Sequence, residues 1–521
     1  MSLPASTFAS TQDAVSDLRR PCASFASTIW GDTFLQYVSD ESMEVNHDVK
    51  QQAQILKEEL KMMFKSSNQN IMQKLNFIDS VQRLGISYHF QKEIDQALEQ
   101  IYNKFTKNNN IIGEYGSHYF FALLFRLLRQ QGYHISSSVF NKLKNDQGNF
   151  KETLANDIQG LCILFEATHL RTHEDDILQE ACDFSNTLLK SLTNQLSSSL
   201  IAQINHCLRQ PLNKSVSRFE ARYHMNPSHN KTLLTFAKVD FNILQKIYQK
   251  EISNITKWWK ISNFETKVPY GRDRLVEAYL WSLAMYYKPK YNNERIFMGK
   301  LISVVCLLDD IYDVYGTVQE LELFTEAIQR WNITPIESLP QCMKEVFDIV
   351  VELCDEIELA TTDSGKSSFE IPRFKQVVFN LIKGYMVEAK WCNEEFTTKN
   401  IFDWIFNDPN IIKVVSVIGR FEQQRVHVAS GMKCCMKQYG ILEAEAYILI
   451  QNDVEDGWKV INEEYLKLKD IPKFVLDCVV NLARMSEISY EIHQDKFINR
   501  ELLKPYVSSL LLEPMCLDQQ E

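Results

Sequence analysis

The sequence predicts an all-α protein, and three observations point to that class. Glycine and proline are scarce, with 16 and 13 residues in a chain of 521, whereas proteins typically contain about 7% and 5%. Apolar residues make up 45% of the chain, which is enough to fill a large core. Apolar positions recur at three- and four-residue steps, the spacing of amphipathic helices rather than of strands. The length suits two or three domains.

Composition also narrows the functional classes. The net charge of −11 argues against a nucleic-acid partner, which would require a basic surface. No apolar run approaches the length that spans a bilayer, so we expect no membrane partner, and we expect a monomer. The twelve cysteines form no Cys-x-x-Cys pair, which is typical of reduced thiols in an intracellular protein.

We expect three parts along the chain. Residues 1–19 are rich in serine but contain two aspartates, which favours a short disordered leader of a cytoplasmic protein over a basic transit peptide. Residues 20–230, whose helical periodicity starts near Asp48, contain no cluster of histidines, cysteines or acids with ligand spacing, and we expect them to form an N-terminal helical scaffold. Residues 231–521 are expected to form the catalytic helical domain, which opens on one long amphipathic helix over Lys231–Lys260.

The stretch LISVVCLLDDIYDVYGT, residues 301–317, brings three carboxylates to the end of an apolar segment. We expect a buried helix over residues 296–315, because apolar side chains cover nearly every direction around its axis. Asp309 and Asp313 are four positions apart, so they share one face, and Asp310 lies beside them. A hard divalent cation relieves their repulsion and burial, and Mg²⁺ prefers carboxylate oxygens while keeping positions for water and phosphate. The pattern therefore predicts a magnesium-bridged diphosphate at Asp309, Asp310 and Asp313; the plain alternative is a solvated acidic helix end.

A second stretch, VPYGRDRLVEAYLWSLAMYY, supplies positive charge and aromatic rings. Arg272 lies in a loop that gives way to a helix, which we expect to begin at about Arg274. A guanidinium group suits diphosphate because it binds oxyanions bidentately and stays charged. Trp281 follows on the helix, and an aromatic face stabilises a cation without offering a nucleophile. Each feature alone also fits surface arginines or core aromatics, but together with the carboxylates they predict ionisation of an allylic diphosphate in a dry apolar pocket.

Longer strings of the sequence match a known family in order. They are RPCASFASTIWGDTFL, KLNFIDSVQRLGISYHF, NDQGNFKETLANDIQGL, YGRDRLVEAYLW, LLDDIYDVYGTVQELELFTEAIQRW and LKPYVSSLLLEP. On these strings, the chain from about Arg20 to Pro514 resembles plant terpene synthases, in particular cytosolic sesquiterpene synthases. The resemblance implies two all-α domains, the second a class I terpene synthase bundle with an apolar cavity, and a magnesium cofactor with manganese as the alternative. It also implies ionisation and cyclisation of farnesyl diphosphate with release of diphosphate.

The resemblance further implies roles for individual residues. Asp309 and Asp313 become metal ligands, joined by Glu422 as the last ligand of a second metal motif. Arg272 and Arg274 become diphosphate and lid residues. The catalytic residues are thus Asp309, Asp313, Arg272 and Arg274. The substrate-binding residues are Arg272, Asp309, Asp313, Arg420 and the cavity-wall residue Trp281. The metal ligands are Asp309, Asp310, Asp313 and Glu422.

The sequence departs from the family pattern in three places. Only residues 392–401 lie where the family has a longer run of helices, so about thirty residues, roughly 45 Å of helix, have no counterpart. In the second metal motif Glu422 has its match, but the positions of its two partner ligands fall on Val414 and Ile418 or are missing. Near the end, Phe497 stands where the family has a tyrosine.

The junction at 420–421 has a geometric consequence. Arg420 and Glu422 are two residues apart, which is about 200° around an ideal helix, whereas in the family both side chains face the cavity. The sequence therefore leaves two interpretations, an active sesquiterpene synthase or a catalytically impaired homologue, the latter including a faulty gene model. A third, a prenyl-chain elongase, is disfavoured because the sequence contains no second aspartate-rich motif.

Overall fold

The protein is helical throughout the part of the chain that its computed structural model describes. That part comprises residues 28–38, 46–66, 70–107, 117–192, 196–226, 229–332, 337–362, 367–393, 435–437, 439–490, 496–497 and 499–517. Within these ranges, the one departure from helices and turns is an isolated bridge between Lys144 and Phe150. The expected all-α class is confirmed. Each helix in these ranges is too short or too polar to cross a lipid bilayer.

The chain divides into two compact units, and each unit combines segments that are far apart in the sequence. The first unit contains Met1–Ser27, Asn263–Asp273 and Val304–Phe396, and the second contains Thr28–Ser262, Arg274–Ser303 and Thr397–Glu521. This division reflects packing, so the domain boundary expected before Lys231 stays a prediction.

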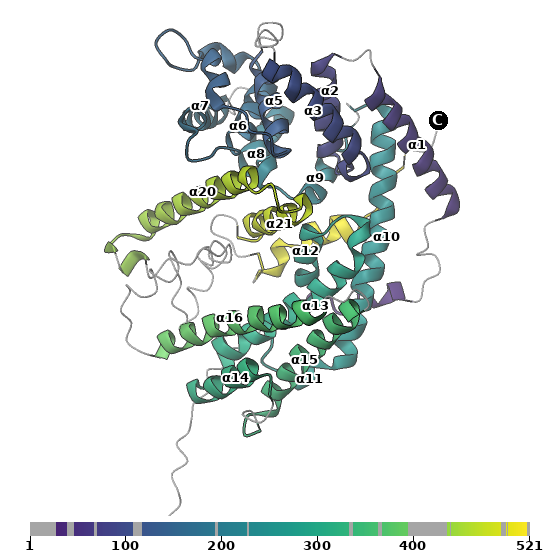
Figure 1. The fold of residues 1–521 in the computed structure, drawn as a ribbon, viewed down its shortest axis with the longest axis vertical. Helices are drawn as coiled ribbons and strands as arrows, with labels where there is room; N and C mark the ends of the chain where they lie inside the picture. Colours follow the sequence, from purple (N-terminus) through teal and green to yellow (C-terminus); the bar gives the residue numbers. More distant parts are fainter. Residues whose placement is uncertain are drawn as a thin grey trace, which may run out of the picture. The chain divides into compact units, whose positions relative to one another are not determined.

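The second unit holds most of the helices (Figure 1). They are α1 (His47–Lys65), α2 (Ile71–Arg83), α3 (Gln91–Lys107), α5 (His118–Gln130), α6 (Ile158–Thr168), α7 (Asp176–Leu192), α8 (Ser198–Arg209), α9 (Ser217–His224), α10 (Lys231–Ser262), α12 (Leu275–Met285), α20 (Glu443–Lys467), α21 (Lys473–Ser489) and α22 (Lys504–Val507), followed by a π-helical turn, η12 (Ser508–Leu512). Short 3₁₀ turns link them: η1 (Leu35–Val38), η3 (Ser87–His89), η4 (Ser137–Leu143), η5 (Glu152–Asn156), η6 (Leu212–Lys214), η7 (Pro289–Tyr291) and η11 (Arg500–Leu502).

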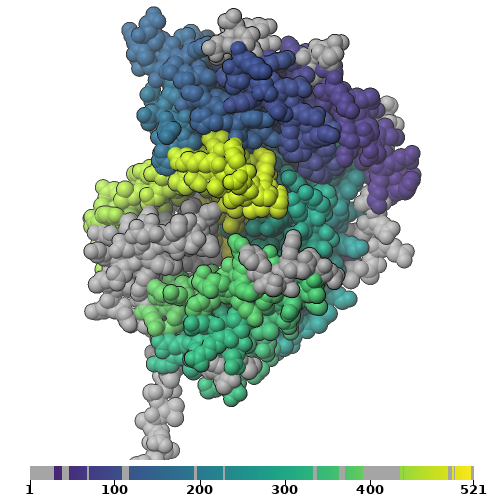
Figure 2. All heavy atoms as spheres, viewed as in Figure 1, coloured from purple at the N-terminus to yellow at the C-terminus, as the bar shows by residue number. Residues whose placement is uncertain are grey.

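The core of this unit is built around α5 and α6. Residues 120–129 of α5 and 160–168 of α6 are all buried, as expected of helices that are apolar on nearly every face. The side chains of α1, α2 and α3, purple to dark blue in Figure 2, lie side by side at the surface. These early helices therefore surround a shared apolar centre.

Local sequence signals explain where the helices begin. The side chain of Asn46 accepts a hydrogen bond of 2.9 Å from the backbone N–H of Asp48, which caps the start of α1 near the expected position. Asn70 and Gln73 form a reciprocal capping box at the start of α2, and such caps satisfy backbone donors that the helix leaves unpaired. The long helix expected over Lys231–Lys260 is confirmed as α10.

Segments from the two ends of the sequence are tied together inside this unit. The guanidinium of Arg171 lies 2.8 Å from the carboxylate of Glu455 in α20. Asn462 lies seven residues after Glu455 on α20. Its side-chain amide donates to the carbonyl oxygens of His169 and Arg171 at 3.0 and 2.9 Å. The indole N–H of Trp30 donates to the buried carboxylate of Glu277 in α12 at 3.1 Å. The late helices are thus part of the same packing unit as the early ones.

The first unit contains α11 (Phe264–Lys267), α14 (Val318–Arg330), α15 (Gln341–Thr362) and α16 (Ser367–Asn393), with α14 and α15 packed against α16 (Figure 1). Helix α13 (Asn292–Asp310) contributes its last residues to this unit and its first residues to the other. It is followed by a π-helical turn, η8 (Ile311–Tyr315), closed by a 2.8 Å hydrogen bond from the N–H of Gly316 to the carbonyl of Ile311.

The helix expected over 296–315 therefore needs two corrections. It begins at Asn292, and its α-helical part ends at Asp310, where the wider turn takes over. Its burial is also uneven: Val304 and Leu307 are buried, whereas Leu301 is partly exposed. An all-round apolar pattern predicts burial on every side, but only the end that carries the aspartates follows that expectation closely.

Three helices of the second unit, α10, α12 and the start of α13, meet at a buried ionic group. Both oxygens of Glu251 accept hydrogen bonds from the guanidinium of Arg295, at 2.6 and 2.8 Å. The hydroxyl of Tyr279 donates to the same carboxylate at 2.7 Å. All three side chains are buried, so each depends on the others for its charge or hydrogen bonds.

We expect Glu251→Ala to lower the free energy of unfolding by about 3–5 kcal/mol, because it leaves the Arg295 guanidinium buried without its counter-ion. Urea unfolding followed by circular dichroism measures this loss. Lys260→Ala is the matched control, since Lys260 forms an exposed pair with Asp32 at 3.3 Å and such pairs contribute about 0–1 kcal/mol. Equal losses of stability in the two variants would contradict the stabilising role of Glu251 as the counter-ion of Arg295.

Candidate active site

The loop before α12 approaches the end of α13 closely. A Cβ atom added to Gly271 would lie 2.6 Å from the Cδ2 atom of Leu307 and 3.1 Å from the carbonyl oxygen of Val268. Glycine therefore allows a backbone approach that a larger residue would obstruct. This approach brings the next residue, Arg272, against the aspartates at the end of α13.

Arg272 is the centre of the charged group in the first unit. Its guanidinium forms ion pairs with Asp309 through Nη2 and with Asp310 through Nε, the latter at 2.5 Å. Its backbone N–H also donates to the Oδ2 atom of Asp310 at 2.7 Å. Burial opposes the charged guanidinium, but Asp310 and Asp309 outweigh it and hold the pKa of Arg272 well above its ordinary value. Arg272 thus neutralises much of the repulsion between the two carboxylates.

The three aspartates lie in different surroundings. Asp310 is 0% exposed, and both its oxygens face Arg272. The side chain of Asp309 is 25% exposed, and Asp313, one turn further along, is partly exposed. Solvent-facing carboxylate oxygens separated by one helical turn are suitable ligands for a hard divalent cation. Asp309 and Asp313 fit the predicted metal site, whereas the contacts of Asp310 favour holding the Arg272 loop, and its role as a metal ligand stays a prediction.

A tyrosine, Tyr385, lies near the aspartates, and the sequence did not predict it. Burial and the carboxylates of Asp309 and Asp313 raise the pKa of Tyr385, on α16, well above its ordinary value. The ring of Tyr385 lies 5.9 Å from that of Tyr312. Tyr385 carried no signal in the sequence, because its approach to the aspartates depends on how α16 packs.

Arg274 and Trp281 belong to the second unit. Arg274 is buried and occupies the N-cap of α12, so the helix begins within one residue of the expected position. Trp281 lies on α12, and its ring meets those of Tyr490 and Phe497 at 6.3 and 6.1 Å in edge-on arrangements. Such geometry is favourable between aromatic rings. Phe497, noted in the sequence as a departure from tyrosine, is therefore a direct neighbour of the predicted wall residue.

The remaining predicted residues cannot be placed in the same way. Arg420, Glu422, the junction at 420–421 and most of residues 392–401 lie outside the described residues. Their roles stay predictions from the family resemblance.

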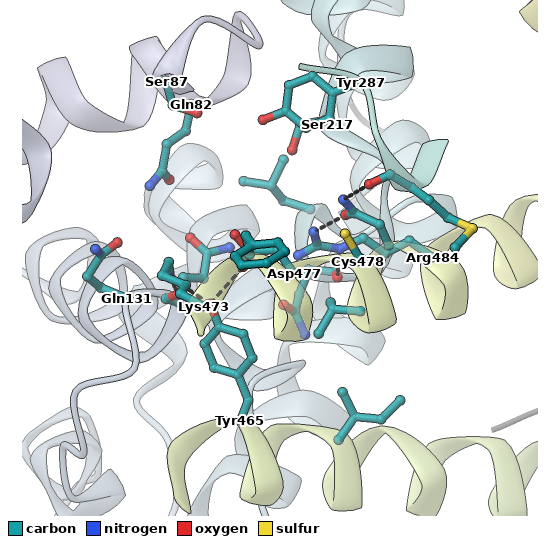
Figure 3. A pocket seen from close by; sticks show the side chains of 18 of the residues that line it. Gln82, Ser87, Gln131, Ser217, Tyr287, Tyr465, Lys473, Asp477, Cys478 and Arg484 are labelled. Atoms are coloured by element: carbon teal, nitrogen blue, oxygen red, sulfur yellow. Dashed lines mark hydrogen bonds between the residues drawn. The ribbon is translucent and has the colours of Figure 1, made fainter. Parts of the chain in front are cut away.

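A pocket of about 160 Å³ lies in the second unit, and Figure 3 shows its lining. The side chains come from several helices, with Tyr465 on α20 and Lys473, Asp477 and Arg484 on α21. The hydroxyl of Tyr465 accepts a hydrogen bond from the ammonium of Lys473 at 2.6 Å and donates to Asp477 at 2.9 Å (Figure 3). None of the predicted site residues that the structure describes lines this pocket, and its charged lining differs from the apolar cavity that the sequence predicts.

Both halves of the chain match models of one protein family. The model described as terpene synthase, N-terminal domain, matches residues 29–208. The model described as terpene synthase family, metal binding domain, matches in two pieces, residues 260–399 and 393–460. The pieces meet within the stretch where the sequence predicts missing residues.

Proteins of similar sequence match nearly the whole chain. A (−)-germacrene D synthase of Vitis vinifera is 39% identical, and the match covers 96% of each chain. A sesquiterpene synthase of Santalum austrocaledonicum is 38% identical over 96% of this chain and 97% of its own. The alignment with the germacrene D synthase has 545 positions, whereas 96% of this 521-residue chain is about 500 residues, so about 45 positions have no residue here.

Solved structures also match the fold over nearly the whole chain. Isoprene synthase from grey poplar (Populus x canescens) is 29% identical with a TM-score of 0.83, covering 96% of this chain and 100% of that chain. The same enzyme in complex with three Mg²⁺ ions and dimethylallyl-S-thiolodiphosphate has a TM-score of 0.82 at 29% identity, covering 91% and 98%.

The unequal surroundings of the aspartates lead to a stability test. We expect Asp310→Ala to lower the free energy of unfolding by about 3–5 kcal/mol, since it breaks a buried ion pair. Asp309→Ala should cost about 1 kcal/mol or less, because Arg272 keeps Asp310 and the lost carboxylate is partly solvated. Urea unfolding of both variants without added metal provides the comparison. Similar losses would show that the two carboxylates have equivalent structural roles.

Proposed function

The chain belongs to the terpene synthase family, and from this premise we propose that it is a sesquiterpene synthase that ionises and cyclises farnesyl diphosphate with Mg²⁺. The observation that carries the proposal is the charged group at the end of α13, where buried Arg272 is paired with two aspartates while Asp309 and Asp313 still reach solvent. The sesquiterpene synthases among its relatives support the choice of a fifteen-carbon substrate.

Asp309 and Asp313 would hold the metal, with Glu422 as a further ligand. A bound Mg²⁺ supplies Lewis-acid stabilisation of the negative charge that develops on the leaving diphosphate. Carboxylate oxygens suit Mg²⁺ best among protein ligands and also suit Mn²⁺. The proposal therefore names Mg²⁺ first and Mn²⁺ as its substitute.

Arg272 links the carboxylates to the substrate. Its backbone N–H and Nε are held by Asp310, while Nη2 meets Asp309. With a cation held by Asp309, the Nη groups of Arg272 would be free to bind phosphate oxygens, which a guanidinium binds bidentately. Arg274, two residues further along, would add a second positive charge. Asp310 then acts as a positioning residue that keeps Arg272 in place.

The chemistry that these residues would support is heterolysis of the allylic C–O bond. The bonding electron pair leaves with the diphosphate, and the remaining farnesyl cation cyclises and ends by proton loss or water capture. The aromatic face of Trp281 would stabilise positive charge without forming a bond to it. Its packing against Tyr490 and Phe497 keeps the ring in one orientation, and the apolar surroundings would keep water from quenching the cation.

A catalytically impaired homologue is the second candidate, and one observation favours it. The metal-binding domain model matches in two pieces, and about 45 positions of the germacrene D synthase alignment have no residue in this chain. Loss of residues next to Glu422 would separate it from its two partner ligands. Incomplete neutralisation of the leaving diphosphate would then reduce the rate, since such terms are typically worth several kcal/mol.

We expect Asp309→Ala and Asp313→Ala to reduce turnover of farnesyl diphosphate at least a hundredfold, because each removes a metal ligand. Product formation is measured by gas chromatography at saturating Mg²⁺. Unchanged far-ultraviolet circular dichroism separates this loss from unfolding. The exposed residue Asp456 provides the control substitution, Asp456→Ala, which should retain full turnover. Wild-type rates in both aspartate variants would rule out the ligand role.

We expect a chain with about forty family residues restored between Trp391 and Glu422 to turn over farnesyl diphosphate at least a hundredfold faster than the 521-residue chain. The physical reason is that restored helix turns return Arg420 and the metal ligands to one face. The same product assay is run on both proteins at matched concentration. Equal rates would mean that this chain is complete as a catalyst and that other residues supply the missing ligands.

A further inference from the structure

Three side chains of the second unit form a cluster that the proposed reaction does not use. His206 lies on α8, and Glu220 and His224 lie on α9. One potential ligand atom from each lies within 4.8 Å of the others. Residues 20–230 show no cluster with ligand spacing in the sequence, and it is the fold that brings these three side chains together from two helices.

The cluster arises from simple helix geometry. Glu220 and His224 are four residues apart on α9, so their side chains share one face of that helix. His206 comes from the preceding helix, which the chain leaves before it turns back through η6 into α9. The separation of 14 residues between His206 and Glu220 matches no simple ligand spacing, because it is the turn that brings the two helices together.

The contacts leave His224 in an unusual position. The Nε2 atom of His206 lies 2.7 Å from the Oε2 atom of Glu220, and the His206 ring stacks on Tyr223 at 3.6 Å. The backbone carbonyl of His224 accepts hydrogen bonds from His229 at 3.0 Å and from the side-chain amide of Asn226 at 3.3 Å. Among the described residues, none forms a hydrogen bond with the ring nitrogens of His224.

The distances suit a small cation. Zinc binds histidine nitrogen at about 2.0–2.1 Å and carboxylate oxygen at about 2.0–2.2 Å, so tetrahedral ligand atoms lie about 3.4 Å apart. To reach this spacing, the 2.7 Å distance between His206 and Glu220 would have to increase, and the longer distances in the cluster, up to 4.8 Å, would have to decrease. Rotation of the side chains can supply both movements. Two imidazoles and one carboxylate leave one position for water. This donor set favours zinc, cobalt or nickel over Mg²⁺, which prefers oxygen ligands.

The charges around the cluster are compatible with a cation. Arg83 lies close enough to interact electrostatically with His224. The positive charge of Arg83 is itself matched, because it pairs with Asp79 at 3.0 Å and also with Glu166. Glu220 is buried and supplies the negative charge that a divalent ion needs.

We propose that His206, Glu220 and His224 bind a divalent transition-metal ion, with zinc as the best match. The ion would join α8 to α9 as a structural clip and is chemically distinct from the magnesium proposed at Asp309 and Asp313. Because only the folded chain brings the three ligands together, binding should stabilise the fold by mass action.

The test uses Co²⁺ as a spectroscopic substitute for zinc, in the full chain and without substrate. Co²⁺ bound by nitrogen and oxygen ligands in tetrahedral geometry gives visible absorption bands that report the site directly. We expect the bands to saturate at one equivalent, to disappear on addition of Zn²⁺ and to persist in excess Mg²⁺. We also expect Zn²⁺ to raise the thermal unfolding midpoint. His224→Phe should weaken Co²⁺ binding at least tenfold and abolish the zinc-induced shift.

Three controls make the outcome decisive. His224→Phe replaces a ring that forms no side-chain hydrogen bond with the residues that the structure describes, so it should fold and retain basal turnover. His229→Phe makes the same substitution next to the cluster and should keep the Co²⁺ bands, as should Asp309→Ala. Bands that are absent, that survive in His224→Phe, or that vanish in Asp309→Ala would overturn the proposal. A thiolate-to-cobalt charge-transfer band would also overturn it, because the ligands would then be cysteines.

Discussion

Carboxylates at the buried end of an apolar helix require positive charge close by. An unpaired buried charge costs several kcal/mol, and α13 ends in two consecutive aspartates, one of them fully buried. Arg272 meets that requirement with its side chain and its backbone N–H. The close approach of Gly271 to Leu307 places Arg272 there. The geometry of the loop, the end of α13 and the position of the aspartates are thus set by one ionic arrangement.

The same arrangement couples the carboxylates to the proposed substrate. The Oδ2 atom of Asp309 is paired with Arg272, so a metal ion bound at Asp309, as we propose, would compete with the guanidinium. A diphosphate would relieve this competition by offering oxyanions to both the metal and Arg272. On this account, the charges of the ligand-free site pair internally, and metal and substrate would complete the site together, with Asp310 holding Arg272 in place.

Much of the fold and of the candidate site could be predicted from the sequence, wherever the interacting residues lie close together along the chain. The long helix α10, the start of α12 and the shared face of Asp309 and Asp313 follow from periodicity, the loop before Arg274 and four-residue spacing. The proximity of Arg272 to Asp309, 37 positions later, was implied by the family resemblance alone. Local patterns are reliable because helix geometry fixes them.

Other features depend on packing between distant segments and left no sequence signal. The π-helical turn at Ile311, the full burial of Asp310 and the nearness of Tyr385 each require neighbours that periodicity cannot identify. The cluster of His206, Glu220 and His224 was missed for the same reason, since it forms across a turn between two helices. The edge-on contact of Phe497 with Trp281 likewise joins segments far apart in the chain.

Competition between Arg272 and the metal for Asp309 is the central claim, and a calorimetric titration of Mg²⁺ into ligand-free protein tests it most directly. Arg272→Gln removes the competing charge while keeping a hydrogen-bonding group near Asp310. We expect this variant to bind Mg²⁺ at least fivefold more tightly than the wild type, because the carboxylates regain their full negative potential. The added affinity should vanish in the double variant that also carries Asp309→Ala. Equal or weaker Mg²⁺ binding by Arg272→Gln would contradict the account.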